Sequence, residues 1–106
     1  MPAWNLPNDN DSQVGQLMIK KNVKIVNKLG LHARAAMKLV NLASRYQSKI
    51  LIRYNNREVD AKSIRNVMVL AAGYGKTIEL IVSGDDEQDA MNAVEKLIKD
   101  KFGESE

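Results

Sequence analysis

The sequence predicts an α+β fold in which an antiparallel sheet is covered by helices on one side. Hydrophobic periodicity gives the order strand, helix, strand, strand, helix, strand, helix, which contains no repeat of the parallel βαβ type. Each predicted strand has apolar residues at alternate positions, as expected where one face of a sheet is buried. A chain of 106 residues with 44% hydrophobic side chains is long enough for one hydrophobic core and too short for two.

Residues 1–16 are predicted to be a flexible tail, because they lack an apolar period and contain both prolines; the domain then spans residues 17–106. The tail does not resemble a signal peptide, and no apolar stretch approaches the twenty residues of a membrane span. The chain has no cysteine and one histidine, which excludes disulfides, thiolate zinc sites and histidine-cluster metal sites. We expect a cytoplasmic protein that binds no membrane and needs no metal or cofactor.

The first strand and first helix are predicted from a change of period. Residues 17–27 alternate, with Ile19, Val23 and Ile25 on one face, and a Lys28-Leu29-Gly30 turn ends the strand. A helix follows over about residues 33–46. Its buried stripe is expected to hold Ala36, Leu39, Val40 and Ala43. Met37 falls outside that stripe, where a flexible apolar side chain could form part of a docking surface or of the core periphery.

The middle of the chain is predicted to be a hairpin followed by a short helix. Strands over residues 48–54 and 57–61 are joined by Asn55-Asn56, since asparagine tolerates the positive φ of tight hairpin turns. Ser63 is a suitable N-cap for the short helix. The apolar positions of that helix are Ile64, Val67, Met68 and Leu70.

The last strand and helix complete the order. Residues 77–83 form the fourth strand, with Ile78, Leu80 and Val82 inward. Asp85 or Asp86 is expected to cap the final helix, and Asp85 with Gln88 fits a capping box. The buried stripe of this helix is expected to contain Ala90, Val94, Leu97 and Ile98, and Gly103 is expected to end it.

The candidate site is the stretch Gly30 to Ala36, which contains the only histidine. His32 stands where the strand pattern gives way to the helical one, so it lies at or next to a helix N-cap. A helix N-terminus offers unpaired N–H groups and the positive end of the helix dipole, and Arg34 adds a guanidinium that matches phosphate oxygens. These groups suit a histidine that carries a phosphoryl group. The alternative is a structural or solvated surface histidine.

Three motifs in order resemble the HPr family of histidine-containing phosphocarrier proteins of the phosphoenolpyruvate-dependent phosphotransferase system. They are Gly-Leu-His-Ala-Arg at 30–34, Asp-Ala-Lys-Ser-Ile-Arg-Asn-Val-Met at 60–68 and Gly-Asp-Asp-Glu-Gln at 84–88. The resemblance covers about residues 18–103. Within it, the segment from Asn27 to Leu39 is most similar to the nitrogen-related branch, NPr.

The resemblance implies a fold and a reaction. The fold would be an open-faced β-sandwich of four antiparallel strands in the order 1-4-2-3, with three helices on one face. Phosphorylated enzyme I would pass its phosphoryl group to Nδ1 of His32, which would hand it to an EIIA-type acceptor. Arg34 and the backbone N–H groups of Ala33 and Arg34 would hold the phosphoryl oxygens. The chain would then be a carrier rather than a stand-alone catalyst. Nothing in the sequence suggests an obligate dimer, so we expect a monomer.

Two positions depart from the family pattern. Ala35 replaces the usual proline after the arginine, which leaves the helix start slightly less fixed and puts the phosphorylation rate in doubt. Arg65 replaces a residue that is commonly apolar in relatives and contributes to partner docking, together with Met37, Ile64 and Met68. An arginine there would change which acceptor fits, so a regulatory, nitrogen-related role is favoured over sugar transport.

Two other functions are consistent with parts of the sequence. The family resemblance implies that Ser63 is a regulatory phosphorylation site for an HPr serine kinase/phosphorylase. The chain could then be a binding module that is switched by phosphorylation of Ser63 and in which His32 takes no part. A helix N-cap also explains this serine. Residues 18–65 hold twelve Lys and Arg against two acidic residues. That charge would steer an acidic protein partner or RNA; five aromatic residues and no aromatic-basic run argue against nucleic acid.

Overall fold

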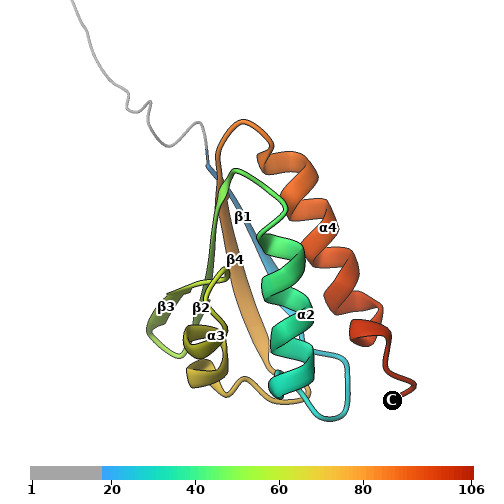
Figure 1. The fold of residues 1–106 in the computed structure, drawn as a ribbon. Coiled ribbons are helices and arrows are strands. Elements are labelled where there is room, and N and C mark those ends of the chain that lie inside the picture. The colour runs from blue at the N-terminus through green and yellow to red at the C-terminus, as the bar shows by residue number, and fades with distance from the viewer. Residues whose placement is uncertain (1–17) are drawn as a thin grey trace, which may run out of the picture.

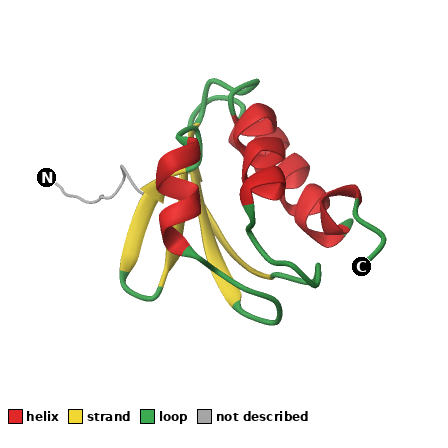
Figure 2. Ribbon diagram, turned by 60° about the horizontal axis from the view of Figure 1, so that its bottom comes forward, coloured by secondary structure: helices red, strands yellow, loops and turns green. Residues whose placement is uncertain are grey.

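The computed structural model describes residues 18–106, which form a four-stranded antiparallel sheet with three helices on one face (Figures 1 and 2). The strand order is β1-β4-β2-β3, as expected. The predicted tail, residues 1–16, lies outside the described residues. The strands are β1 (Met18–Lys24), β2 (Lys49–Tyr54), β3 (Arg57–Asp60) and β4 (Thr77–Ser83). The helices are α2 (Ala33–Ala43), α3 (Ile64–Leu70) and α4 (Glu87–Lys99), and a 3-10 turn, η2 (Lys101–Gly103), follows α4.

The core lies between the inner face of the sheet and the helices. Alternate strand residues meet there across the central strands: Ile50 pairs with Val82, and Ile52 with Leu80. All four side chains are fully buried. α2 packs against both α3 and α4, and α4 also covers β1 and β4. No helix among residues 18–106 combines the length and the apolar character needed to cross a bilayer.

The helical stripes differ in detail from those predicted. Val40 of α2 and Leu97 of α4 are only partly buried, because they stand at the margins of their stripes. Ala35 and Met91, which were not included in the predicted stripes, are buried. The buried residues of α2 are mostly small: Ala35, Ala36 and Ala43 are each fully buried, as is Leu39.

Three element ends were placed several residues too late in the sequence, and β3 ends one residue early, at Asp60. β1 ends at Lys24, and after Ile25, which still donates its N–H to Lys76 O at 2.8 Å, the chain bends and turns over residues 27–29. α2 ends at Ala43, after which Tyr46 N–H donates to Ala43 O at 3.2 Å in a tighter turn. α4 ends at Lys99, so Gly103 ends η2 rather than the helix.

The predicted capping box at the start of α4 is wrong. The N-cap is Asp86, and its carboxylate accepts hydrogen bonds from outside the helix: from Gln47 N and Ser48 N, both at 2.9 Å, and from the Ser48 hydroxyl. Glu87 instead accepts from Gly84 N at 3.1 Å. The side chain of Asp86 therefore ties the start of α4 to the segment before β2.

The hairpin and the Ser63 cap were predicted correctly. Asn55 and Asn56 have φ values of 56° and 68°, as a two-residue hairpin turn requires. Ser63 Oγ accepts from Asn66 N at 3.4 Å, a long hydrogen bond at the start of α3.

Candidate functional site

The loop between β1 and α2 is fixed by a close backbone contact. Gly30 has a φ of 68°, and a Cβ at this position would lie 2.8 Å from Gly73 Cα and 2.9 Å from Ala72 O. The next residue, Leu31, is buried and donates its N–H to Ala72 O at 3.0 Å. Only glycine fits this combination of backbone conformation and space. The contact sets the point at which α2 starts.

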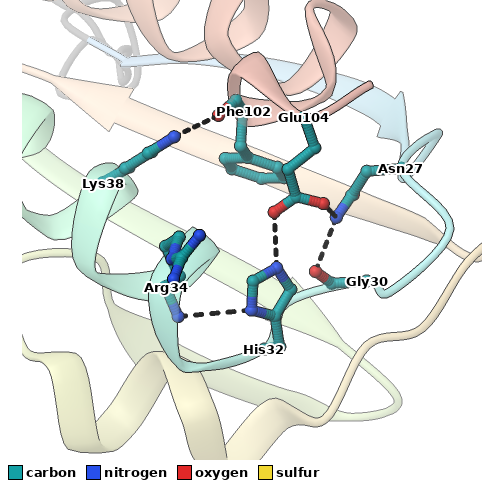
Figure 3. Close-up of polar contacts among 7 residues, drawn as sticks. All are labelled: Asn27, Gly30, His32, Arg34, Lys38, Phe102 and Glu104. Atoms are coloured by element: carbon teal, nitrogen blue, oxygen red, sulfur yellow. Dashed lines mark hydrogen bonds and ion pairs between the residues drawn. The ribbon is translucent and has the colours of Figure 1, made fainter. Parts of the chain in front are cut away.

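His32 is the N-cap of α2, as the sequence predicted. Its backbone is extended, and its carbonyl accepts the first helical hydrogen bond from Ala36 N at 2.8 Å. The ring nitrogen Nδ1 accepts from Arg34 N at 3.3 Å (Figure 3). Nδ1 therefore faces the N–H end of the helix, where the dipole favours negative charge.

The other ring nitrogen contacts a residue that sequence analysis missed. His32 Nε2 bonds to Glu104 Oε2, and Glu104 Oε1 accepts from Asn27 Nδ2 at 3.1 Å (Figure 3). Because Nδ1 accepts an N–H, the neutral ring carries its hydrogen on Nε2 and donates it to the carboxylate. Burial acts to raise the pKa of Glu104, but hydrogen bonds from His32 and Asn27, together with the positive charges of Lys38 and of His32 when its ring is protonated, hold it below its ordinary value.

Glu104 reaches the histidine because the chain after α4 is anchored. Phe102 is buried, and its carbonyl accepts from Lys38 Nζ at 2.7 Å. Lys28 N donates to Glu106 O at 2.7 Å, and Lys28 Nζ lies 3.6 Å from a Glu106 carboxylate oxygen. The segment from Phe102 to Glu106, here called the C-terminal segment, therefore lies along the β1–α2 loop.

The C-terminal segment covers part of His32. The His32 side chain keeps 28% of its accessible surface, because Glu104 covers the Nε2 edge. The open edge faces a cavity of about 310 Å³. Its lining consists of His32, Arg34, Lys28 and Leu29 together with Glu104, Ser105 and Glu106.

Arg34 and Ala33 lie where the sequence placed them, in the first turn of α2, and both are exposed. Arg34 and His32 both line the cavity. One ligand in the cavity could therefore contact the positive charge of Arg34 and the imidazole of His32. Ala35, the departure from the family pattern, is fully buried in the same turn. The first turn contains no acidic residue that would oppose an anion.

The expected docking residues are exposed on two helices that pack together. Met37 on α2 and Ile64 and Met68 on α3 keep 52%, 37% and 43% of their accessible surface, and Arg65 is also exposed. Val69, at 50%, adds an apolar side chain on α3 that sequence analysis did not single out. Ser63, at the start of α3, is half-buried.

The fold is an open-faced α+β domain with a histidine at the start of α2. A family model described as "PTS HPr component phosphorylation site" matches residues 19–100. The chain is 52% identical over 89 residues to the phosphocarrier protein HPr of Cupriavidus necator, a match that covers 84% of this chain and 100% of the relative. The chain therefore belongs to the PTS HPr family.

Solved structures agree with this assignment. HPr-C-His from Thermoanaerobacter tengcongensis has a TM-score of 0.80 and 41% identity, over 83% of this chain and 99% of that one. Crh, the catabolite repression protein of Bacillus subtilis, has a TM-score of 0.64 and 32% identity, over 78% and 95% of the two chains. The Crh structure is described as a domain-swapped dimer.

Proposed function

We propose that His32 accepts a phosphoryl group from phosphorylated enzyme I and passes it to an EIIA-type acceptor. One observation carries this proposal: Nδ1 of His32 faces the N–H end of α2 beside Arg34, while Nε2 is held by Glu104. A neutral ring in this tautomer has its lone pair on Nδ1. This arrangement supports Nδ1 as the nucleophile, because a doubly negative group bound to it would meet backbone donors and a guanidinium.

The transfer needs only groups that the site contains. The Nδ1 lone pair attacks phosphorus, the bond to the donor's histidine breaks, and its electron pair returns to that histidine. The hydrogen bond between Arg34 N and Nδ1 must open when the P–N bond forms, which frees this N–H for a phosphoryl oxygen. Arg34 and the backbone N–H groups of Ala33 and Arg34 are the proposed ligands of the phosphoryl oxygens. Onward transfer reverses these steps.

The exposed surface formed by Met37, Ile64, Arg65 and Met68 is the proposed docking surface for both partners. Neither α2 nor α3 contains an acidic residue, so the apolar side chains stand among cations and suit an acidic partner.

We expect the chain to act as a monomer in the cytoplasm. A monomer leaves this surface free, and sedimentation at micromolar concentration tests the expectation against a dimer such as that of Crh.

A regulatory, nitrogen-related branch is proposed on the basis of Arg65. This residue is exposed on the proposed docking surface, where a charge selects against an apolar partner face. If the branch assignment holds, Arg65→Phe increases the rate of transfer to sugar-specific EIIA domains and lowers the rate to a nitrogen-related one. Equal rates before and after the substitution would remove the support for this branch.

The test of the relay is labelling with phosphoenolpyruvate and enzyme I. We expect an acid-labile, base-stable label on the natural chain and on Ser63→Ala, and none on His32→Ala. Label on His32→Ala would overturn the assignment of His32. An acid-stable label that appears only with a serine kinase and disappears in Ser63→Ala would support the rival function, a switch at Ser63. Ser63 is half-buried and lies at the start of α3, beside the proposed docking surface. Its position supports regulation, because a phosphate there would add negative charge next to that surface.

A further inference from the structure

We propose that Glu104 is a positioning residue that controls how readily phosphorylated His32 gives up its phosphoryl group. This inference rests on the proposed function and assigns the readiness for onward transfer to a residue outside the histidine motif. The observation is the hydrogen bond between His32 Nε2 and Glu104 Oε2, at the ring nitrogen that takes no part in P–N bond formation.

The geometry places the carboxylate on one ring nitrogen and leaves the other for chemistry. Glu104 keeps 18% of its side-chain surface and is oriented by Asn27 Nδ2 at 3.1 Å. Asn27 itself is fully buried and also donates to Gly30 O at 2.8 Å. The orientation of the carboxylate is therefore set by a group fixed to the turn that precedes His32.

The chemical consequence follows from the leaving group. When a nucleophile attacks phosphorus, the P–Nδ1 bond breaks and its electron pair stays on Nδ1. If Nε2 is protonated, the ring leaves as neutral imidazole; if it is not, the ring leaves as imidazolate, a much poorer leaving group. A carboxylate on Nε2 favours the protonated, cationic form of the phosphorylated ring. Glu104 therefore keeps the phosphoryl group ready for transfer, and also susceptible to hydrolysis.

Other charged groups near the ring could mask the effect of Glu104 on the protonation of Nε2. The groups that line the cavity with His32 are Glu104 and Glu106 from the C-terminal segment, Arg34 from α2, and Lys28 from the loop after β1. Lys38 from α2 acts on Glu104. Glu106 is paired with Lys28 and exposed, whereas Glu104 is the carboxylate in direct contact with the ring.

The C-terminal segment has anchors that do not use the Glu104 side chain. Buried Phe102, the hydrogen bond from Lys38 Nζ to Phe102 O, and that from Lys28 N to Glu106 O all remain in a Glu104 variant. Glu104→Gln therefore removes the charge with the segment in place. Glu106→Gln is the matched control, since it removes an equal charge two residues away from an exposed pair.

The experiment measures hydrolysis of the phosphorylated 106-residue chain. Each variant is phosphorylated with phosphoenolpyruvate and enzyme I, or with phosphoramidate, and loss of phosphohistidine is followed by ³¹P NMR from pH 5 to pH 9. We expect Glu104→Gln to hydrolyse roughly threefold to tenfold more slowly near neutral pH, because a charge-assisted hydrogen bond in a partly solvated site is lost. The hydrolysis rate of Glu104→Gln should also start to decrease at a lower pH than the hydrolysis rate of the natural chain. Glu106→Gln keeps the natural profile.

A second measurement does not depend on phosphorylation. His32 is the only histidine, so its Nε2–H proton gives one unambiguous resonance in the unphosphorylated chain. That resonance should move upfield in Glu104→Gln and stay in place in Glu106→Gln. Unchanged hydrolysis profiles in Glu104→Gln, or an equal effect in both variants, would overturn the role of Glu104. A natural chain that takes no phosphoryl group on histidine would instead overturn the proposed function, whatever the Nε2–H resonance shows.

Discussion

Asn27 and Glu104 are joined by a hydrogen bond of 3.1 Å, although 77 residues separate them in the sequence. The same Asn27 amide nitrogen donates to Gly30 O at 2.8 Å. A buried amide thus links the turn before His32 to the C-terminal segment that covers it.

Asn27→Ala should destabilise the protein by about 1–3 kcal/mol, because the Gly30 carbonyl and the Glu104 carboxylate lose their common donor in a buried place. Urea denaturation measures the change in the free energy of unfolding. Asn92→Ala is the control, since Asn92 is exposed on α4 and accepts from Gln88 Nε2 at 3.0 Å. Equal midpoints for the two variants would show that the Asn27 hydrogen bonds contribute nothing.

Phe102→Ala should cost about 3–5 kcal/mol, because the phenyl ring is 1% exposed and leaves a cavity when it is removed. The loss should also release the C-terminal segment, so the Nε2–H resonance of His32 is expected to move as it does in Glu104→Gln. Thermal unfolding and NMR check the two expectations. Leu29→Ala, which truncates a side chain that is 69% exposed near the same site, should change the midpoint little.

Much of the fold follows from local patterns, and the histidine half of the site follows from them too. Alternation and helical periods predicted the strands and helices, and the change of period at Gly30 placed His32 at a helix start. Asn55 and Asn56 predicted their hairpin through a backbone preference that is a property of the residue itself. Each of these signals lies within a few neighbouring positions.

The other half of the site depends on long-range contacts that leave no periodic signal. Glu104 lies 72 residues after His32, and nothing in its neighbours indicates a contact with the ring. It reaches the site because Lys101, Phe102 and Gly103 all have positive φ and turn the chain after α4. The capping box failed for a similar reason: Asp86 occupies the N-cap position, but its carboxylate accepts from Gln47 N and Ser48 N rather than from the first turn of α4.

Gly30→Ala should be far more destabilising than Gly75→Ala. Both glycines have positive φ, 68° and 82°, so both substitutions introduce backbone strain of about 1–2 kcal/mol. A Cβ at Gly75 would meet no atom within 4 Å, whereas one at Gly30 would lie 2.8 Å from Gly73 Cα. The difference between the two midpoints in urea isolates the cost of pushing the loop away from Gly73.

The Gly30 variant should also lower the rate of labelling by enzyme I, since Leu31 and His32 must move with the loop. Gly75→Ala should be labelled at nearly the natural rate. Similar stability for both variants would mean that the backbone contact at Gly30 is not what fixes the start of α2.

Asp86→Asn should destabilise the protein at neutral pH and leave it almost unchanged in acid. Hydrogen bonds from the Ser48 side chain and from Gln47 N, against a smaller opposing effect of burial, lower the pKa of Asp86 from its ordinary value of 3.8. A carboxyl whose pKa is lower in the folded state stabilises that state fully above pH 3.8 and loses the contribution as the pH falls through its folded pKa.

Urea denaturation at pH 7 and at pH 2 measures the gap in the free energy of unfolding between the natural chain and the Asp86→Asn variant. The gap should narrow in acid, whereas Asp85→Asn, which removes the same charge from the exposed neighbouring side chain, should show little gap at either pH. A gap of equal size at both values would mean that Asp86 holds α4 to the segment before β2 by shape and neutral hydrogen bonds rather than by its charge.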